Sequence, residues 1–131
     1  MKKLIEAAKK AQKNAYAPYS RFPVGAAIQT RSGKVFTGAN VENSAYPLSR
    51  CAEQIAVGAM VTAGEREIEA VVVASTSSPP AAPCGACRQV LAEFAGPEAL
   101  VVCVNDRGEE RRYRLGELLP EAFSLRSPNK T

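Results

Sequence analysis

The sequence predicts a three-layer α/β/α sandwich, in which helices cover both faces of a mixed, mostly parallel five-stranded sheet. Two apolar runs rich in β-branched residues, 68–74 and 100–104, have the length of strands buried on both faces. Helical patterns of roughly 10–15 residues alternate with them, which favours parallel β-α-β units. A Gly-containing turn within residues 24–40 adds a hairpin at one side of the sheet. At 131 residues, the chain fits a single domain over 1–131.

The start of the chain predicts one helix and then the hairpin. Apolar residues fall near helical spacing over 3–15, and Pro18 follows as a stop. Two short strands, 24–30 and 34–40, flank the turn that contains Gly33. Basic and apolar residues are interleaved in the first segment, which indicates an amphipathic helix and not a signal peptide. We therefore expect a cytoplasmic protein, in which disulfides are rare.

The remaining chain alternates helices and strands. Gly64 and Gly96-Pro97 end two apolar helical stripes, and the segment 75–83 is rich in turn residues. The expected elements are helices over 51–63 and 84–95, strands over 68–74, 100–104 and 111–115, and a short helix over 115–119. Residues 124–131 predict a loose tail.

Composition excludes several classes of protein. With 46% hydrophobic and 23% charged residues, the chain has the composition of a folded globular protein, and no apolar run approaches the roughly 20 residues of a membrane span. The net charge of +4 hints only weakly at nucleic acid, because the densest basic run, Arg111, Arg112 and Arg114, is typical of a solvated face. We expect neither a membrane nor a nucleic-acid partner.

The chain contains no histidine, which excludes a Ser-His-Asp triad, a Cys-His pair and histidine-ligated zinc or haem. Proton transfer near neutral pH must fall to Asp, Glu, Lys, Tyr, Cys or a metal-bound water. Four cysteines in a chain without an export signal point to a metal or to catalysis before they point to disulfides.

Three of these cysteines stand at expected helix starts. Cys84 and Cys87 form a Cys-x-x-Cys pair, and Cys51 opens the preceding helix. Free backbone N–H groups at a helix N-terminus lower the pKa of a thiol, and three protein ligands on zinc leave one position for water. Cys103 could complete a closed Cys₄ site, but its place within an apolar strand favours a core residue. Glu53, two residues after Cys51, is either a proton shuttle beside the metal or a first-turn acid that complements the helix dipole.

These motifs resemble those of the zinc-dependent cytidine deaminases. The resemblance lies in Cys-Ala-Glu at 51–53 and Pro-Cys-Gly-Ala-Cys at 83–87, and the class is known for its Pro-Cys-x-x-Cys signature and non-ligand Glu. The segments 18–27, 38–43 and 118–123 also look like the small, all-cysteine-ligand, homotetrameric branch of the family.

The resemblance implies one Zn²⁺ per subunit, held by Cys51, Cys84 and Cys87, with water as the fourth ligand. Glu53 would take the water's proton, protonate ring N3 and assist the departure of ammonia. The implied reaction is the hydrolytic deamination of cytidine and deoxycytidine to uridine and deoxyuridine, a step of pyrimidine salvage.

The resemblance also implies a nucleoside-binding set. Asn40 and Glu42 would bind the ribose hydroxyls, and the carboxylate of Glu42 would accept a free 3′-OH and repel a phosphate. Taken alone, both are ordinary turn residues after a strand. The other expected contacts are the N–H of Ala52 to the base carbonyl, Phe22 in the pocket, Phe123 in a neighbouring subunit's site, and Tyr46 at the interface or pocket. Either phenylalanine could instead be a core residue.

The sequence departs from the family at Gln54, where members of this branch usually carry Arg. Three thiolates on Zn²⁺ give a net negative charge, which weakens the metal as a Lewis acid. We hypothesise that Arg50 or Arg88 compensates by a hydrogen bond to a thiolate.

Three other functions remain open from the sequence. The chain could deaminate another aminated pyrimidine, such as a cytosine-containing antibiotic. It could be a structural zinc module that binds nucleic acid, which would need Cys103 as the fourth ligand. It could also be a catalytically inactive homologue used for binding.

Overall fold

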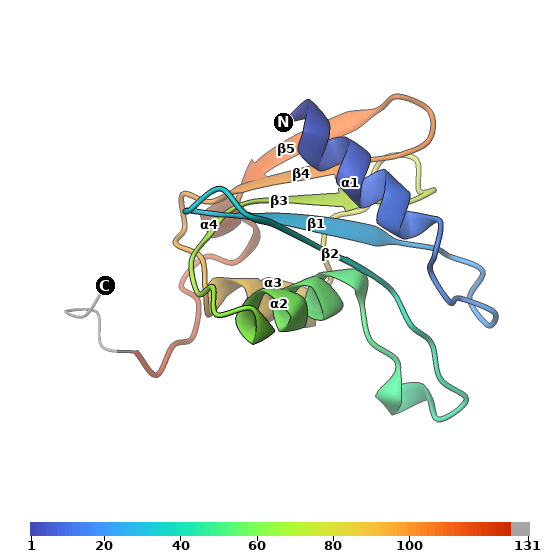
Figure 1. Ribbon diagram of the computed structural model, residues 1–131, viewed down its shortest axis with the longest axis horizontal. Helices are drawn as coiled ribbons and strands as arrows, with labels where there is room; N and C mark the ends of the chain where they lie inside the picture. Colours follow the sequence, from blue (N-terminus) through green and yellow to red (C-terminus); the bar gives the residue numbers. More distant parts are fainter. Residues whose placement is uncertain (127–131) are drawn as a thin grey trace.

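A computed structural model describes residues 1–126 and confirms the three-layer arrangement. Figure 1 shows α1 (Lys2–Gln12) on one face of the sheet, with α2 (Ala52–Thr62) and α3 (Gly85–Ala92) on the other. The strands are β1 (Gly25–Thr30), β2 (Val35–Ala39), β3 (Ile68–Ala74), β4 (Leu100–Val104) and β5 (Glu110–Arg114). A 3₁₀ turn, η1 (Tyr46–Leu48), precedes α2, and a short helix, α4 (Leu115–Leu118), follows β5.

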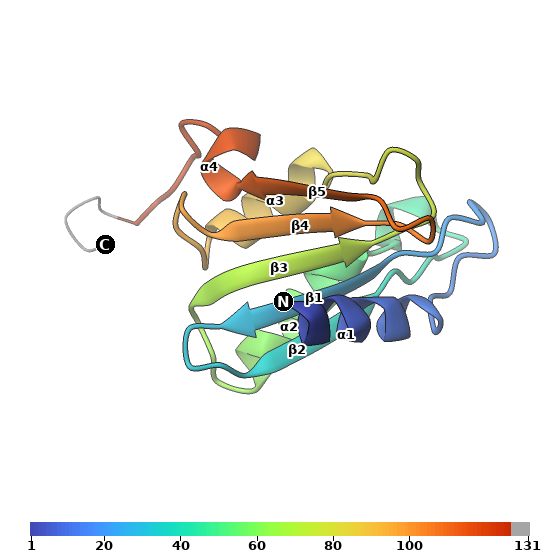
Figure 2. The same cartoon turned by 90° about the horizontal axis from the view of Figure 1, so that it is seen from above.

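The sheet has the order β2-β1-β3-β4-β5, which can be followed from above in Figure 2. Only β3 and β4 pair in parallel, whereas β1 pairs antiparallel with both β2 and β3, and β5 pairs antiparallel with β4. The prediction of a mostly parallel sheet is therefore wrong. The unit β2-α2-β3 does have parallel strands, as the alternation predicted, but the hairpin strand β1 lies between them and pairs with both.

Both faces of β3 and β4 are buried, as their continuous apolar runs predict. Side chains that alternate along these strands face opposite layers. Val71 and Val101 pack in a cluster with Met60 of α2 and Leu91 of α3. The cluster on the other face contains Val72, Val102 and α1 residues Leu4 and Ala8. The central strands therefore hold all three layers together.

The helices lie almost directly on the hairpin backbone, and glycines make this approach possible. A Cβ atom on Gly38 of β2 would lie 2.5 Å from the Ala56 nitrogen and 2.6 Å from the Ala52 oxygen of α2. On the other face, a Cβ on Gly25 of β1 would lie 2.1 Å from the Ala8 oxygen of α1. Because α2 rests against bare backbone at Gly38, the position of its first turn is set by that contact.

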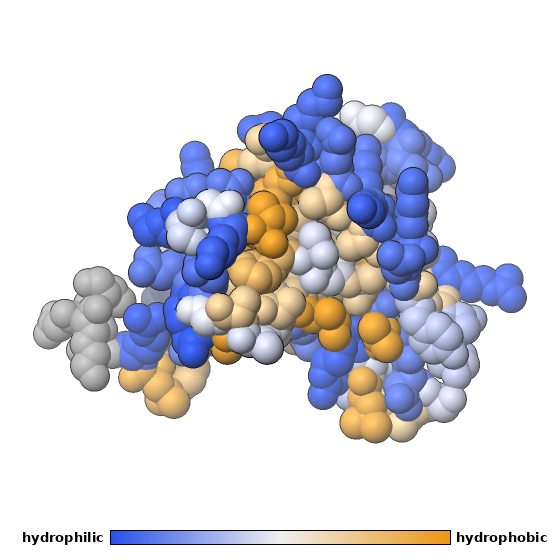
Figure 3. All heavy atoms as spheres, in the orientation of Figure 1, coloured by the Kyte–Doolittle hydropathy of each residue, from blue (hydrophilic) through white to orange (hydrophobic). Residues whose placement is uncertain are grey.

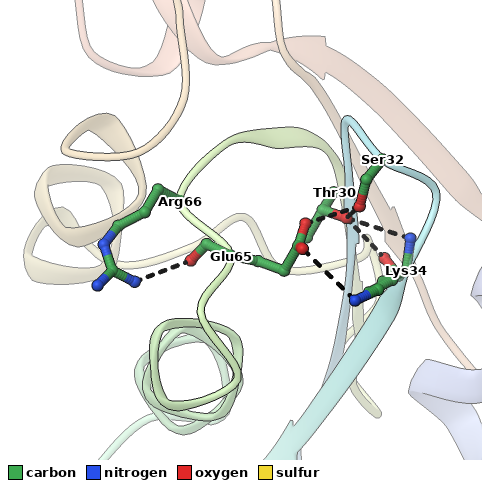
Figure 4. Close-up of polar contacts among 5 residues, drawn as sticks. All are labelled: Thr30, Ser32, Lys34, Glu65 and Arg66. Carbon is green, nitrogen blue, oxygen red and sulfur yellow. Dashed lines mark hydrogen bonds and ion pairs between the residues drawn. The ribbon is translucent and has the colours of Figure 1, made fainter.

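A polar cluster joins the hairpin turn to the connection that follows α2 (Figure 4). Glu65 accepts a hydrogen bond of 2.7 Å from the Ser32 hydroxyl, and its other carboxylate oxygen lies 3.7 Å from the Lys34 ammonium. The buried Thr30 hydroxyl bonds to the Ser32 hydroxyl at 3.0 Å and accepts the Lys34 N–H at 3.1 Å. This cluster fixes the C-terminal end of α2 relative to the hairpin.

The structure differs from the expected boundaries mainly at the helix ends. The first helix ends at Gln12 and α3 at Ala92, each three residues before its expected end. Ser124, Leu125 and Arg126 are exposed, and the rest of the expected tail, 127–131, lies outside the described residues. Within 1–126, no helix has the length and apolar character needed to cross a membrane.

Replacing Gly38 by Ala tests the contact between β2 and α2. We expect Gly38→Ala to lower the free energy of unfolding by about 2 kcal/mol or more, because the backbone atoms it meets cannot move without displacing the helix. Urea unfolding followed by circular dichroism measures the change. The control is Gly58→Ala in the same helix, where a Cβ meets nothing within 4 Å and helix propensity favours Ala. Equal unfolding midpoints for Gly38→Ala and the wild type would contradict the expected role.

Candidate active site

The site lies where α2 and α3 begin, after the carboxyl ends of β2 and β3. These two strands run parallel, so the two helix N-termini come to the same edge of the sheet, which is where ligands bind in α/β folds. A cavity of about 720 Å³ is lined by residues from both helix starts and from the segments before β1 and after β2. The lining includes the sequence-predicted residues Phe22, Asn40, Glu42, Tyr46, Arg50, Cys51, Ala52, Glu53, Cys84 and Cys87.

The two helix starts bring three cysteine sulfurs together. Cys51 is the N-cap of α2, Cys84 is the N-cap of α3, and Cys87 is the third residue of α3. The Sγ atoms of Cys51 and Cys84 are 4.0 Å apart, those of Cys84 and Cys87 are 3.4 Å apart, and all three lie within 4.8 Å of one another. None of these cysteines is in a disulfide.

This cluster fits a zinc ion. Thiolates at about 2.3 Å from a tetrahedral zinc lie roughly 3.8 Å from one another, close to the spacing observed here. Three sulfurs are a donor set that selects zinc over hard cations, and they leave the fourth zinc position open. Cys51, Cys84 and Cys87 are therefore the residues that could hold the metal. Cys103 is fully buried in β4 and is not part of the cluster, as expected of a core residue.

The cysteines influence one another's ionisation. A hydrogen bond from Cys87, with smaller effects of Cys84 and of the charge of Arg50, lowers the pKa of the Cys51 thiol to about 6 against the effect of burial. The same hydrogen bond, with burial and the Glu53 carboxylate, raises the pKa of Cys87. A divalent cation favours the thiolate at every ligand, so binding of zinc releases protons from this cluster.

Glu53 is a carboxyl group enclosed beside the sulfurs. It is the second residue of α2, it lines the cavity, and only 4% of its surface is exposed. Burial, followed by the negative charge of Cys51, raises the pKa of Glu53 to about 7, although hydrogen bonds from the backbone and from Cys87 oppose the rise. A carboxyl group that titrates near neutrality can both take and give a proton at that pH. This property favours the proton-shuttle interpretation of Glu53 over the first-turn acid.

Gln54 forms a hydrogen bond to one of the three clustered cysteines. Its Nε2 lies 3.7 Å from the Cys87 Sγ. Arg50 donates instead to the carbonyl oxygens of Pro47 and Ser49, at 3.0 and 2.8 Å. Arg50 therefore acts on Cys51 through its charge, and the hydrogen bond to a thiolate comes from a neutral amide.

Arg88 also hydrogen-bonds away from the sulfurs. It donates to the carbonyl oxygens of Pro83 and Leu118, at 2.7 and 2.8 Å, and so ties the start of α3 to α4. Over residues 1–126, neither arginine forms the hydrogen bond to a thiolate that we hypothesised. Arg88 instead fixes the backbone next to Cys84.

Asn40 and Glu42 follow β2 and line the cavity, and both bind the segment that precedes β1. Asn40 accepts the Val24 N–H and donates to the Phe22 oxygen, each at 2.9 Å. Glu42 accepts the Tyr19 N–H at 2.9 Å. Asn40 and Glu42 are therefore more than ordinary turn residues, because their side chains hold two chain segments together at the cavity wall.

Of the three predicted aromatic contacts, Phe22 and Tyr46 line the cavity and Phe123 does not. Phe22 lines the cavity and is 36% exposed. Tyr46 in η1 also lines it but is 82% exposed, and Phe123 is 70% exposed and does not line the cavity of its own chain. Neither phenylalanine is a core residue.

Sequence reasoning gave no role to several residues that line the cavity. Among them are Ser20 and Tyr19, which lie next to Pro18 in a segment that already carried the family resemblance. The available signal was Ser20, a polar residue within that motif. Its partner Glu42 lies 22 positions away, so the local sequence pattern could not predict their contact.

Comparisons with known proteins point to one family. The family model described as the cytidine and deoxycytidylate deaminase zinc-binding region matches residues 1–104. A cytidine deaminase of Sporosarcina psychrophila is 44% identical over 124 residues, which cover 95% of this chain and 91% of the relative. The crystal structure of cytidine deaminase from Burkholderia pseudomallei superposes with a TM-score of 0.89 at 50% identity, covering 93% of this chain and 98% of the other. That from Mycobacterium tuberculosis has a TM-score of 0.79 at 42% identity, covering 95% and 97%.

We expect Gln54→Met to weaken zinc binding by about tenfold, because it removes the amide that hydrogen-bonds to Cys87 and keeps the side-chain length. Competition with a chromogenic chelator measures the affinity for zinc, and the thiolate-to-metal absorption of the Co²⁺-loaded protein reports on the ligand sulfurs directly. The matched control is Gln29→Met, whose amide bonds to Glu69 on the sheet. Equal zinc affinity and an unshifted Co²⁺ spectrum in Gln54→Met would show that the contact has no influence on the metal.

Proposed function

The chain belongs to the family of cytidine and deoxycytidylate deaminases, and on that premise we propose that Glu53 carries the proton transfers of its reaction. The protein is a cytidine deaminase, an enzyme that replaces the 4-amino group of cytidine or deoxycytidine by oxygen from water and releases ammonia. One observation supports the role of Glu53 above all others: a buried carboxyl group lines the same cavity as the three zinc-binding sulfurs.

Zinc, one ion per subunit, supplies a Lewis acid that makes water a nucleophile near neutral pH. Glu53 accepts a proton from the attacking water and delivers a proton to N3 of the ring. It then takes the second proton of that water from the new hydroxyl on C4 and passes it to the amino group, which leaves as ammonia while the C4 carbonyl forms. With its pKa raised by burial to about 7, Glu53 exchanges protons in both directions without a large driving force against either. The absence of histidine from the chain leaves this carboxyl group to do work that imidazole does elsewhere.

The cavity wall supplies the proposed contacts to the nucleoside. Ala52 is the first residue of α2, so its N–H has no acceptor within the helix and is available to the base carbonyl. Phe22 provides an apolar wall for the base. Asn40 and Glu42 bind the ribose hydroxyls, with Glu42 accepting from the 3′-OH. A carboxylate there repels a phosphate on the 3′ oxygen, so we propose free nucleosides, and not polynucleotides, as substrates.

A direct assay tests the reaction and the role of Glu53 together. We expect the wild type to convert cytidine to uridine with equimolar ammonia, and Glu53→Gln to lose more than about 10³-fold in kcat, because the amide cannot accept a proton. Chromatography of the nucleosides and an ammonia assay follow the products. The control is Glu6→Gln, on an exposed position of α1. Zinc-loaded, folded wild type that leaves cytidine unchanged would contradict the proposed substrate and direct the search to other aminated pyrimidines.

We also propose that the enzyme is a homotetramer whose sites lie at subunit interfaces. Several large apolar side chains are exposed in the single chain: Tyr46 at 82%, Leu48 at 60%, Phe123 at 70% and Leu125 at 90%. Figure 3 shows hydrophobic residues gathered over the face that carries β2 and α2, and again below it, near η1. Exposed apolar surface of this kind is typical of protein interfaces. Tyr46 borders the cavity, so a neighbour packed on it would close the site.

Mixing two variants of reduced activity, Phe123→Ala and Glu53→Gln, tests whether Phe123 acts in the site of a neighbouring subunit. We expect Phe123→Ala to lower activity, and assembly of mixed oligomers with Glu53→Gln to restore part of it, because each Glu53→Gln subunit supplies Phe123 to a neighbour that retains Glu53. Light scattering should give four times the subunit mass of 13.9 kDa. Activity of the mixture equal to the sum of the separate variants, or a monomeric mass, would contradict the proposal.

A cytoplasmic location is part of the same proposal. The three ligand cysteines must remain thiols until they bind zinc, and the cytoplasm keeps thiols reduced.

A further inference from the structure

A connected set of hydrogen bonds surrounds Glu42 at the wall of the cavity. The segment before β1 wraps past this carboxylate, and its residues Tyr19, Ser20 and Phe22 line the same cavity. Glu42 Oε1 accepts the N–H groups of Tyr19 and Ser20, at 2.9 and 3.1 Å. The Ser20 hydroxyl donates to the other oxygen, Glu42 Oε2.

The direction of the Ser20 hydroxyl proton follows from the ionised state of Glu42. A carboxylate has no proton to give, so the Ser20 hydroxyl donates to it, and Ser20 Oγ in turn accepts the N–H of Phe22 at 3.1 Å. Arg21, between these two residues, has a φ of 56°, a left-handed conformation that is uncommon for a residue with a side chain. This turn brings the Phe22 N–H back to Ser20. The serine is thereby held as a donor toward Glu42.

The hydrogen bonds leave little freedom to the carboxylate. An ionised carboxylate offers about four acceptor positions, and three are taken by the two backbone N–H groups and the Ser20 hydroxyl. These donors, the serine first, also lower the pKa of Glu42 and keep it ionised. The remaining position can only accept, so a ligand must present a donor to it. Ser20 is the one side chain in this set and therefore the one that substitution can remove.

We propose that Ser20 is a specificity-determining positioning residue, whose hydroxyl holds Glu42 so that its remaining lone pair accepts a hydrogen bond from a sugar hydroxyl. The inference rests on the proposed assignment of Glu42 to the 3′-OH of the nucleoside. Ser20 acts through Glu42. Its contribution is therefore to the discrimination between nucleosides with and without that hydroxyl, and it leaves the chemistry at Glu53 unchanged.

The test compares kcat/KM for cytidine with kcat/KM for 3′-deoxycytidine. We expect Ser20→Ala to lower kcat/KM for cytidine by about tenfold, mostly through KM, and to leave the value for 3′-deoxycytidine nearly unchanged. Ser20→Thr keeps the hydroxyl and should retain the wild-type ratio of the two values. The matched control is Ser44→Ala, which removes a 2.7 Å bond to the Tyr19 hydroxyl in the same pair of segments but does not touch Glu42.

The outcomes separate the inference from the function on which it rests. An unchanged ratio of the two kcat/KM values in Ser20→Ala would overturn the proposal. If both values also fell by the same factor, Ser20 would only stabilise the fold. Glu42→Gln provides the reference. If it lowers the ratio and Ser20→Ala does not, the inference alone is wrong. If Glu42→Gln leaves the ratio unchanged while the enzyme still deaminates cytidine, the assignment of Glu42 to the sugar is wrong, and the inference is overturned with it.

Discussion

The packing of α2 and α3 side by side on one face of the sheet is the constraint on which the site depends, because it brings three cysteine sulfurs within 4.8 Å of one another. Each helix follows a strand through a connecting segment, from Ala39 to Ala52 and from Ala74 to Gly85, and the two strands point in the same direction. The N-terminal turns of both helices therefore face a common space. Partial positive charge at these turns suits thiolates, and Glu53, in the first turn of α2, lines the same space. The close contact of α2 with the sheet at Gly38 fixes the position of the first turn of α2 relative to the sheet.

Much of the fold could be predicted because its signals are local. The apolar runs of β3 and β4 and the stripes of α1 and α2 depend on neighbouring residues, and so does the Cys-x-x-Cys spacing of Cys84 and Cys87. The pairing of the sheet depends instead on where the hairpin inserts, and nothing in its own sequence shows that β1 lies between β2 and β3. The partner of Glu42 was missed for the same reason, since Ser20 is distant in the chain. Arg50 was a reasonable candidate by adjacency to Cys51, but its guanidinium turns to backbone carbonyls.

Charge in this site is balanced with few cations. Three thiolates would leave zinc with a net negative charge, and Gln54, which donates a hydrogen bond to the buried Cys87, is a neutral side chain. Helix N-termini and the nearby charge of Arg50 supply the remaining compensation. Glu53 can remain beside this negative cluster because burial lets it hold a proton near neutral pH. A metal centre and the proposed proton shuttle, although of like charge, are thus compatible in one enclosed space.

The proposed zinc and sugar contacts come from different segments of the chain. The three cysteines and Glu53, the proposed proton shuttle, belong to helix starts that pack on the core, whereas the proposed sugar contacts come from the two connections that flank the hairpin. Loops tolerate substitution better than packed helices do. Evolution can therefore alter which nucleosides this scaffold accepts by changing residues around Ser20 and Glu42, while leaving the reaction itself untouched. A scaffold divided in this way is well suited to diversify into deaminases of new substrates.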